Sequence, residues 1–124
     1  MPKKILLIDD DVATHVLVSR MLEPHYSVTT AFSVQEALAM LEDDTPDLIL
    51  CDIAMPVYSG IDFLRFRRDH PVLIHIPVVT ISATGVRDLI TDALQMGATA
   101  CITKPFSRAE LLSAVDQVMG DRHT

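Results

Sequence analysis

Apolar and polar residues follow two different rhythms along this chain. Short runs of consecutive apolar residues, such as Ile5 to Ile8 and Leu48 to Cys51, alternate with longer stretches in which apolar residues recur every three or four positions. The first rhythm is typical of strands buried on both faces, and the second is typical of helices with one buried face. Strands are predicted at residues 3–9, 27–31, 47–51, 77–81 and 100–103. Helices are predicted at residues 11–22, 33–44, 61–69 and 86–96, and from residue 107 onward.

Local signals mark the ends of several predicted helices. Ser33 with Glu36, and Ser107 with Glu110, have the spacing of capping boxes, in which a hydroxyl and a carboxylate satisfy backbone amides at a helix start. Gly97 stands where the fourth helix should end, and glycine is the residue best suited to that position.

The alternation of strands and helices with short connections predicts an α/β fold. Each strand-helix-strand crossover must be right-handed and must cover one face of the sheet, so the sheet is expected to be parallel and doubly wound. We expect five strands in the order 2-1-3-4-5, one of the two common solutions, with five helices around them. In such sheets ligands bind beyond the carboxyl ends of the strands.

Length and composition predict one domain, covering residues 1–124. The 124 residues can bury a core without disulfides or metal, and 49% hydrophobic content excludes disorder. The formal net charge of -7 argues against direct binding of nucleic acid or of an anionic membrane, because there are only ten lysines and arginines. The acidic balance favours cations.

No segment has the features of an export signal or a membrane span. The apolar run Ile5 to Ile8 is far too short for either, so a cytoplasmic location is expected. Cys51 and Cys101 lie inside strand-like runs without a second cysteine or a histidine at ligand spacing. We interpret both as small buried residues rather than catalytic or metal-bound thiols.

Three carboxylates follow the first and third predicted strands. Asp9 and Asp10 end the first apolar run, and Asp52 ends the third, where Pro56 prevents continuation. Neighbouring strands would bring these like charges into one crevice, and a proton or a bound cation must relieve the repulsion. A few oxygen ligands suit Mg²⁺ better than Ca²⁺. The alternatives are that Asp52 opens a turn and that Asp10 or Asp11 caps the following helix.

Two further polar residues end the fourth and fifth strands. Lys104 would supply positive charge for a transferred phosphoryl group, and the Ser82 hydroxyl could donate to a phosphoryl oxygen. Each has a simpler interpretation when taken alone: Ser82 as a turn residue and Lys104 as a solvated lysine. Their shared position at one edge of the predicted sheet favours a joint role.

Four segments carry a recognisable pattern: Leu6-Leu7-Ile8-Asp9-Asp10, then Asp47-Leu48-Ile49-Leu50-Cys51-Asp52 with Met55-Pro56 and Gly60, then Ser82-Ala83, and Lys104-Pro105-Phe106. With them the chain resembles, over essentially its whole length, the receiver domains of two-component response regulators, in particular the single-domain regulators of the chemotaxis type. The resemblance implies a flavodoxin-like receiver fold. It also implies that residues 1–124 form a phosphoacceptor domain without an output domain.

The resemblance implies that Asp52 accepts a phosphoryl group from a histidine kinase or a histidine phosphotransfer protein. Mg²⁺ would be held by Asp10, Asp52 and the backbone carbonyl of Ala54, while Asp9 acts mainly through water or Lys104. Such a domain promotes its own phosphorylation and slow dephosphorylation and is not an enzyme in the ordinary sense. Phosphorylation would move Ser82 and switch the face formed by helix 4, strand 5 and helix 5.

The implied readout is binding of a downstream protein target or control of an output domain, as a monomer or a phosphorylation-dependent dimer. The peptide bond between Lys104 and Pro105 is expected to be cis. Cys101 stands where receivers usually carry Tyr or Phe, so output is expected to run through helix 4. Because Ala54 and Thr84 are small, water should enter and the aspartyl phosphate should not be exceptionally long-lived.

The remaining features are less specific. The apolar surplus of the first helix, including Ala13, Val16 and Leu17, fits core packing or a docking face for the phosphodonor together with Pro105 and Phe106. The five histidines are scattered and are interpreted as surface or helix-flank residues without chemistry: His15, His25, His70, His75 and His123.

Three other functions compete with the receiver interpretation. A haloacid-dehalogenase-like phosphatase needs a second acid two residues after its nucleophile, where the chain has Ala54. A nucleotide- or flavin-binding domain needs a glycine-rich loop after the first strand, where the chain has Asp9-Asp10-Asp11. A pseudo-receiver that only binds partners stays open.

Overall fold

The computed structural model describes residues 3–83 and 87–123, and for residues 87, 88 and 121–123 it describes the backbone only. The strands are β1 (Lys3–Ile8), β2 (Tyr26–Ala31), β3 (Leu48–Asp52), β4 (Val78–Ala83) and β5 (Ala100–Lys104). The helices are α1 (Val12–Leu22), α2 (Val34–Asp43), α3 (Gly60–Arg68), the short 3₁₀ helix η1 (Leu73–His75), α4 (Arg87–Gln95) and α5 (Arg108–His123).

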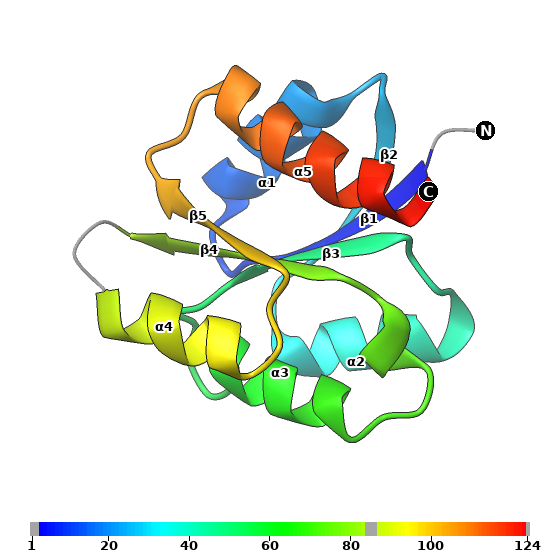
Figure 1. Ribbon diagram of the computed structural model, residues 1–124, viewed down its shortest axis with the longest axis vertical. Coiled ribbons are helices and arrows are strands. Elements are labelled where there is room, and N and C mark those ends of the chain that lie inside the picture. Colours follow the sequence, from blue (N-terminus) through cyan, green and yellow to red (C-terminus); the bar gives the residue numbers. More distant parts are fainter. Residues whose placement is uncertain (1–2, 84–86, 124) are drawn as a thin grey trace.

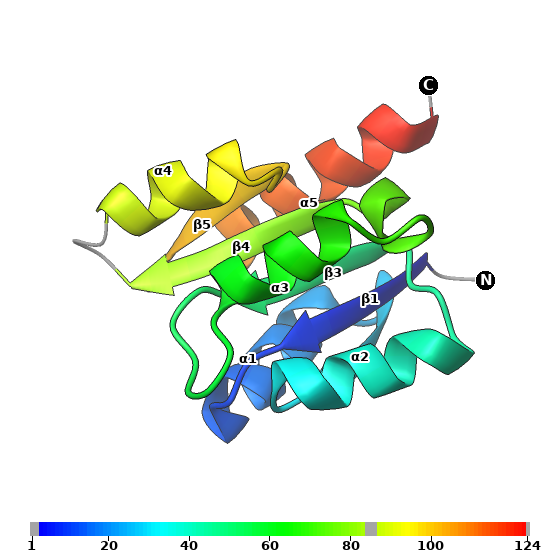
Figure 2. The same cartoon turned by 90° about the horizontal axis from the view of Figure 1, so that it is seen from below.

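The five strands form one parallel sheet in the order β2-β1-β3-β4-β5, which confirms the predicted order. Helices α1 and α5 cover one face of the sheet, and α2, α3 and α4 cover the other (Figures 1 and 2). The structure is therefore the doubly wound α/β fold expected from the alternation of strands and helices. None of the helices in the described ranges has the length and hydropathy of a membrane span.

The core consists of two apolar layers, one on each face of the sheet. Alternate residues of β1 point to opposite faces, so Ile5 and Leu7 join one layer while Leu6 and Ile8 join the other. Residues of β3 alternate in the same way, and all five are buried. Because both faces are covered, the continuous apolar runs seen in the sequence are accounted for.

Helix ends agree with most of the predicted signals. Ser107 and Glu110 form a reciprocal capping box, with the Ser107 amide donating to Glu110 and the Glu110 amide donating to Ser107 Oγ. Gly97, two residues after the last residue of α4, has a φ of 109°, as predicted for a helix-terminating glycine. A further capping box, Ser59 with Asp62, starts α3 and was not predicted.

Other features also went beyond the sequence patterns. The 3₁₀ helix η1 between α3 and β4 was not predicted. Strand β2 begins earlier than expected, at Tyr26, whose hydroxyl donates to the Asp116 carboxylate on α5. The Lys104–Pro105 peptide bond is cis, as the resemblance implied, and so is Glu23–Pro24. The loop residue Thr84 and the predicted helix start Val86 lie outside the described residues.

Candidate functional site

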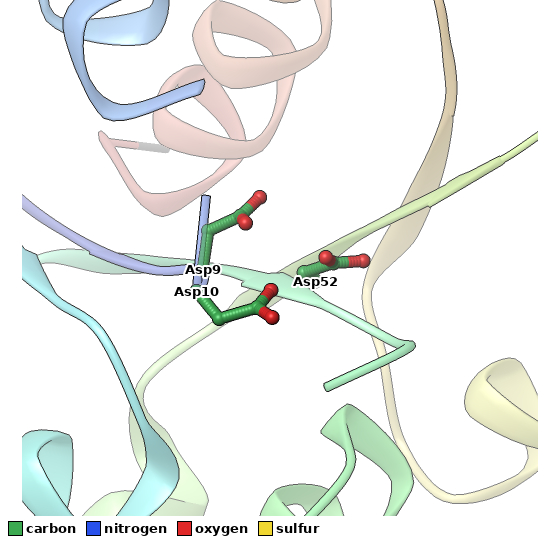
Figure 3. A group of neighbouring side chains, drawn as sticks. All are labelled: Asp9, Asp10 and Asp52. Atoms are coloured by element: carbon green, nitrogen blue, oxygen red, sulfur yellow. The ribbon is translucent and has the colours of Figure 1, made fainter. Parts of the chain in front are cut away.

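Three carboxylates meet at the carboxyl ends of β1 and β3. The register pairs Ile8 with Cys51, so the residues that follow on the two strands lie side by side. Asp9, Asp10 and Asp52 each offer a carboxylate oxygen, and these oxygens all lie within 4.8 Å of one another (Figure 3). The strand order alone therefore assembles the acidic crevice.

The three carboxylates differ in their exposure to solvent. Asp9 is fully buried, Asp52 is 7% exposed, and Asp10 is exposed. Burial raises the pKa of Asp52, and the Asp9 carboxylate raises it further, while Lys104 and the Ala54 amide act in the opposite direction. The ionised form of Asp52 is thus held at a cost in free energy, which a cation or a bound phosphoryl group with its metal can relieve.

Lys104 reaches into this crevice from the end of β5. Its Nζ lies 3.3 Å from Asp9 Oδ2 and 3.7 Å from Asp52 Oδ2. Burial by itself lowers the pKa of Lys104 and is the largest single influence, but Asp52 and Asp9 together outweigh it, so the pKa is raised. The ammonium group therefore stays charged beside the two buried carboxylates.

Backbone amides hold two of the three carboxylates in place. The Asp11 amide donates to Asp9 Oδ1 at 2.9 Å, and the Ala54 amide donates to Asp52 Oδ1 at 3.3 Å. Asp11 itself caps α1 by accepting from the Ala13 amide, so the capping role that the sequence left open between two residues belongs to Asp11. Within the described part of the chain, no hydrogen bond holds the Asp10 carboxylate.

Ser82 lies near the end of β4, which pairs with β3. Its neighbour Ile81 pairs with Asp52 in the sheet register. The Ser82 side chain is 2% exposed, and its Oγ has no hydrogen-bond partner among the described residues. A buried hydroxyl without a partner is costly, so it is available for an incoming oxygen acceptor.

The loop between β3 and α3 packs the start of α3 directly against Asp52. The Gly60 amide donates to the Ile53 carbonyl at 2.8 Å. A Cβ at position 60 would lie 2.5 Å from the Asp52 carbonyl oxygen, so only glycine fits. Earlier in the loop, exposed Val57 has a φ of 68°, and the Tyr58 amide donates to the Pro56 carbonyl around it. The segment after Asp52 is therefore tightly constrained.

The donor set fits a hard divalent cation. All three clustered groups are carboxylates, which suit Mg²⁺, and the sparse set leaves coordination positions for water or phosphate oxygens.

Cys51 is fully buried, and burial raises the pKa of its thiol, with Asp52 and Asp9 adding to the effect. Cys101 is only half-buried, and its Sγ lies 2.7 Å from Thr80 Oγ1.

One residue near the site was misinterpreted from the sequence. His15 is not a surface or helix-flank residue: it is 5% exposed, its Nε2 bonds to the Asp9 backbone carbonyl, and its ring stacks on Phe32 with centroids 4.3 Å apart. The sequence did contain a signal of this burial, because His15 lies three and seven residues before Val18 and Leu22, which are on the buried face of α1. His25, His70 and His75 are exposed, and the side chain of His123 lies outside the described residues.

The family model described as the response regulator receiver domain matches residues 5–116 of the chain. The chain belongs to this family. Receiver domains of two-component systems are characterised by phosphorylation and by magnesium binding.

Similar receiver domains occur in both long and short proteins. The chain is 35% identical over 118 residues to the phosphate regulon transcriptional regulatory protein PhoB of Pseudomonas aeruginosa, covering 94% of this chain and 52% of that protein. It is 30% identical over 122 residues to the polar-differentiation response regulator DivK of Brucella anthropi, covering 98% of this chain and 99% of that protein. The chain thus spans only about half of PhoB.

A solved receiver domain offers a comparison for the acidic crevice. It comes from a sensor histidine kinase of Pseudomonas aeruginosa PAO1 and holds a magnesium ion coordinated in its active site cleft. Its TM-score to this chain is 0.87 at 27% sequence identity, with 97% of this chain and 99% of that chain covered. The same fold therefore accommodates a magnesium ion in its cleft in that protein.

Proposed function

We propose that the chain accepts a phosphoryl group on Asp52 from a histidine kinase or a histidine phosphotransfer protein. The observation that carries the proposal is the position of Asp52: a nearly buried carboxylate with an oxygen within 4.8 Å of both Asp9 and Asp10 and 3.7 Å from Lys104. Repulsion among these carboxylates favours the binding of a divalent cation, and the bound cation can then stabilise a phosphoryl group on Asp52.

The chemical step is an in-line displacement at phosphorus. A carboxylate oxygen of Asp52 attacks the phosphorus of a phosphohistidine, a new O–P bond forms, and the P–N bond breaks. The electron pair of the broken bond stays on the imidazole nitrogen, which leaves as a neutral ring once it holds one proton. The products are an aspartyl phosphate and a free histidine side chain, so that atoms and charge balance.

Several residues have proposed roles around this step. Mg²⁺ would be held by Asp10, Asp52 and the backbone carbonyl of Ala54, and when bound it supplies positive charge to the phosphoryl oxygens. Lys104 presents a second cation to the same oxygens, and it also keeps Asp9 in place through their 3.3 Å contact. The unpartnered Ser82 hydroxyl would donate to a phosphoryl oxygen.

The signalling output follows from the same groups. Movement of Ser82 toward the phosphoryl group would shift the loop after β4 and switch the face formed by α4, β5 and α5. Because Cys101 bonds to Thr80 instead of providing an aromatic ring, we propose that output runs mainly through α4. The small exposed Ala54 would leave water access to the aspartyl phosphate and limit its lifetime.

We further propose that residues 1–124 act as a receiver domain in the cytoplasm, as a monomer or a phosphorylation-dependent dimer, without direct contact to nucleic acid or membrane. Its partners would be the phosphodonor and either a downstream protein or an output domain. The relatives support both arrangements, since the chain covers nearly all of DivK and about half of PhoB.

Intact-mass spectrometry tests the proposed function. The native chain and Asp52→Asn are treated with phosphoramidate and Mg²⁺ and compared. We expect the native chain alone to gain the mass of one phosphoryl group, and EDTA to prevent the gain. If neither chain gains mass under conditions that phosphorylate a known receiver, the chain is a pseudo-receiver that acts only by binding partners.

A further inference from the structure

His15 is a buried histidine whose ring bonds to the backbone of the acidic crevice, at the carbonyl of Asp9. The carbonyl of Asp9 can only accept a hydrogen bond, so the bond to His15 requires the hydrogen to be on Nε2. The other ring nitrogen, Nδ1, is buried and has no hydrogen-bond partner among the described residues. The ring is instead held by stacking on Phe32, which follows β2. His15 thus connects α1, the end of β1 and the loop after β2.

The Asp9 carbonyl is a natural place for such a contact. On the other side of the residue, the Asp9 amide donates to the Ala31 carbonyl at 3.1 Å, and β2 ends at that residue. The next link of the β1–β2 ladder is therefore absent, and His15 satisfies the carbonyl that would otherwise end the strand without a partner. In this way His15 fixes the peptide plane between Asp9 and Asp10.

The orientation of that peptide plane decides where the Asp10 carboxylate points. Asp9 is held by the Asp11 amide and by Lys104, and Asp52 is held by the Ala54 amide and by Lys104. Asp10 has no such side-chain contact in the described part of the chain, although its oxygen completes the 4.8 Å cluster. Among the described residues, it is therefore the backbone of Asp10 that directs its side chain toward Asp52 (Figure 3).

We propose that His15, braced by Phe32, is a positioning residue that sets the Asp10 carboxylate for divalent-cation binding. The inference rests on the proposed function, because it assigns Asp10 to the cation. Groups that orient a metal ligand contribute substantially to affinity without touching the ion, and their loss typically weakens metal binding 10- to 100-fold. His15 acts one step further back, through the peptide of its target, so about a tenfold effect is expected.

The test is a measurement of Mg²⁺ affinity by isothermal titration calorimetry on the full chain. His15→Leu keeps an apolar group against Phe32 but cannot donate to the Asp9 carbonyl, and we expect its dissociation constant to rise about tenfold. His15→Gln places an amide donor near the position of Nε2, and we expect it to stay within about twofold of the native value. His25→Leu, at an exposed site in the same chain, is the matched control and should change nothing.

A double-mutant cycle separates positioning from general destabilisation. In an Asp10→Asn background the additional change His15→Leu should have little further effect on Mg²⁺ affinity, because the group that it positions has already been neutralised. Equal affinities of native chain and His15→Leu, or undiminished losses in the Asp10→Asn background, would overturn the inference alone. No binding of Mg²⁺ by the folded native chain would overturn both this inference and the proposed function.

Discussion

At the scale of single residues, the acidic crevice is an unfavourable arrangement that the fold enforces. Asp52 is 7% exposed and lies beside fully buried Asp9, and its pKa is raised above the ordinary 3.8 first by burial and then by Asp9. Between that ordinary value and the raised value, the folded chain keeps a proton that the unfolded chain has released. The free energy of unfolding therefore decreases as pH rises through this window.

This linkage predicts that Asp52→Asn stabilises the chain at neutral pH. The substitution removes a charge that is ionised at a cost, so the free energy of unfolding at pH 7 in EDTA should exceed that of the native chain. The difference should shrink as pH falls through this window and should be lost below about 4, where Asp52 is protonated in both states. Urea titrations at pH 7 and at acid pH measure it, and a native chain more stable than Asp52→Asn at pH 7 would contradict the account.

Residue positions were predictable from the sequence to different degrees. Asp9, Asp52, Ser82 and Lys104 stand at strand ends, so the strand order alone places them at one edge of the sheet. The role of His15 was not predictable in this way, because its burial depends on Phe32 from a different part of the chain. Sequence spacing shows which face of a helix a residue occupies, but it does not show which distant side chain covers that face.

At the scale of elements, a buried arginine ties α3 to the segments that follow it. Arg67 donates from Nε to the Ile76 carbonyl at 2.8 Å and from Nη2 to the Ile74 carbonyl at 3.1 Å. Its Nη1 lies 3.5 Å from the Gly97 carbonyl after α4. Burial lowers the pKa of Arg67, and backbone carbonyls satisfy the guanidinium without a carboxylate partner at salt-bridge distance among the described residues.

Arg67→Met should therefore destabilise the fold by about 3 kcal/mol, since it leaves buried carbonyl groups without donors. Arg68→Met is the control, because Arg68 is exposed and its pairing with Asp69 lies at the surface. That variant should lie within about 0.5 kcal/mol of the native chain. Urea unfolding at pH 7 compares the two, and equal losses would show that the carbonyl contacts of Arg67 do not carry the effect.

Helix α1 presents more apolar surface than core packing requires. Val12, Val16 and Leu17 are 62%, 49% and 48% exposed, and Leu17 lines a hollow of about 320 Å³ together with Lys104, Pro105 and Phe106. Of the two interpretations that the sequence left open, packing does not account for Val16 and Leu17. The position of Leu17 in the same hollow as Lys104 fits the proposed docking of a phosphodonor protein close to Asp52.

Leu17→Glu tests this docking face. A phosphorylated histidine phosphotransfer protein that labels the native chain should transfer to Leu17→Glu at least about tenfold more slowly, because a charge replaces an apolar contact. Labelling by phosphoramidate should be unchanged. Leu94→Glu on α4 has the same 48% exposure in the native chain and is the matched control. Equal transfer rates for both variants would place the docking face elsewhere.

Helix ends could be predicted where they depend on residues that are close together in the sequence. The Ser107–Glu110 box and Gly97 were predicted because capping depends on residues a few positions apart. The 3₁₀ helix η1 was not predicted, because its backbone is held by the His70 ring, whose Nδ1 accepts from the Val72 and Leu73 amides, and by Arg67. Such side-chain support leaves no periodic pattern in the sequence.

At the scale of the whole molecule, the order of strands in the sheet determines which residues meet at the candidate site. The parallel order brings β1 and β3 together, and with them the acidic pair and Asp52, while β4 and β5 bring Ser82 and Lys104 to the same edge. This arrangement could be predicted because crossover handedness leaves few alternatives. The partners could not be predicted, because they depend on surfaces whose complementary half belongs to other proteins.

The central claim is that Asp52, among three neighbouring aspartates, receives the phosphoryl group. The chain is phosphorylated with phosphoramidate and Mg²⁺, reduced with borohydride, which converts an aspartyl phosphate into homoserine, and analysed by peptide mass mapping. The account predicts homoserine at position 52, with Asp9 and Asp10 unchanged. Homoserine at position 9 or 10, or an unmodified Asp52 in a chain that has gained a phosphoryl group, would contradict it.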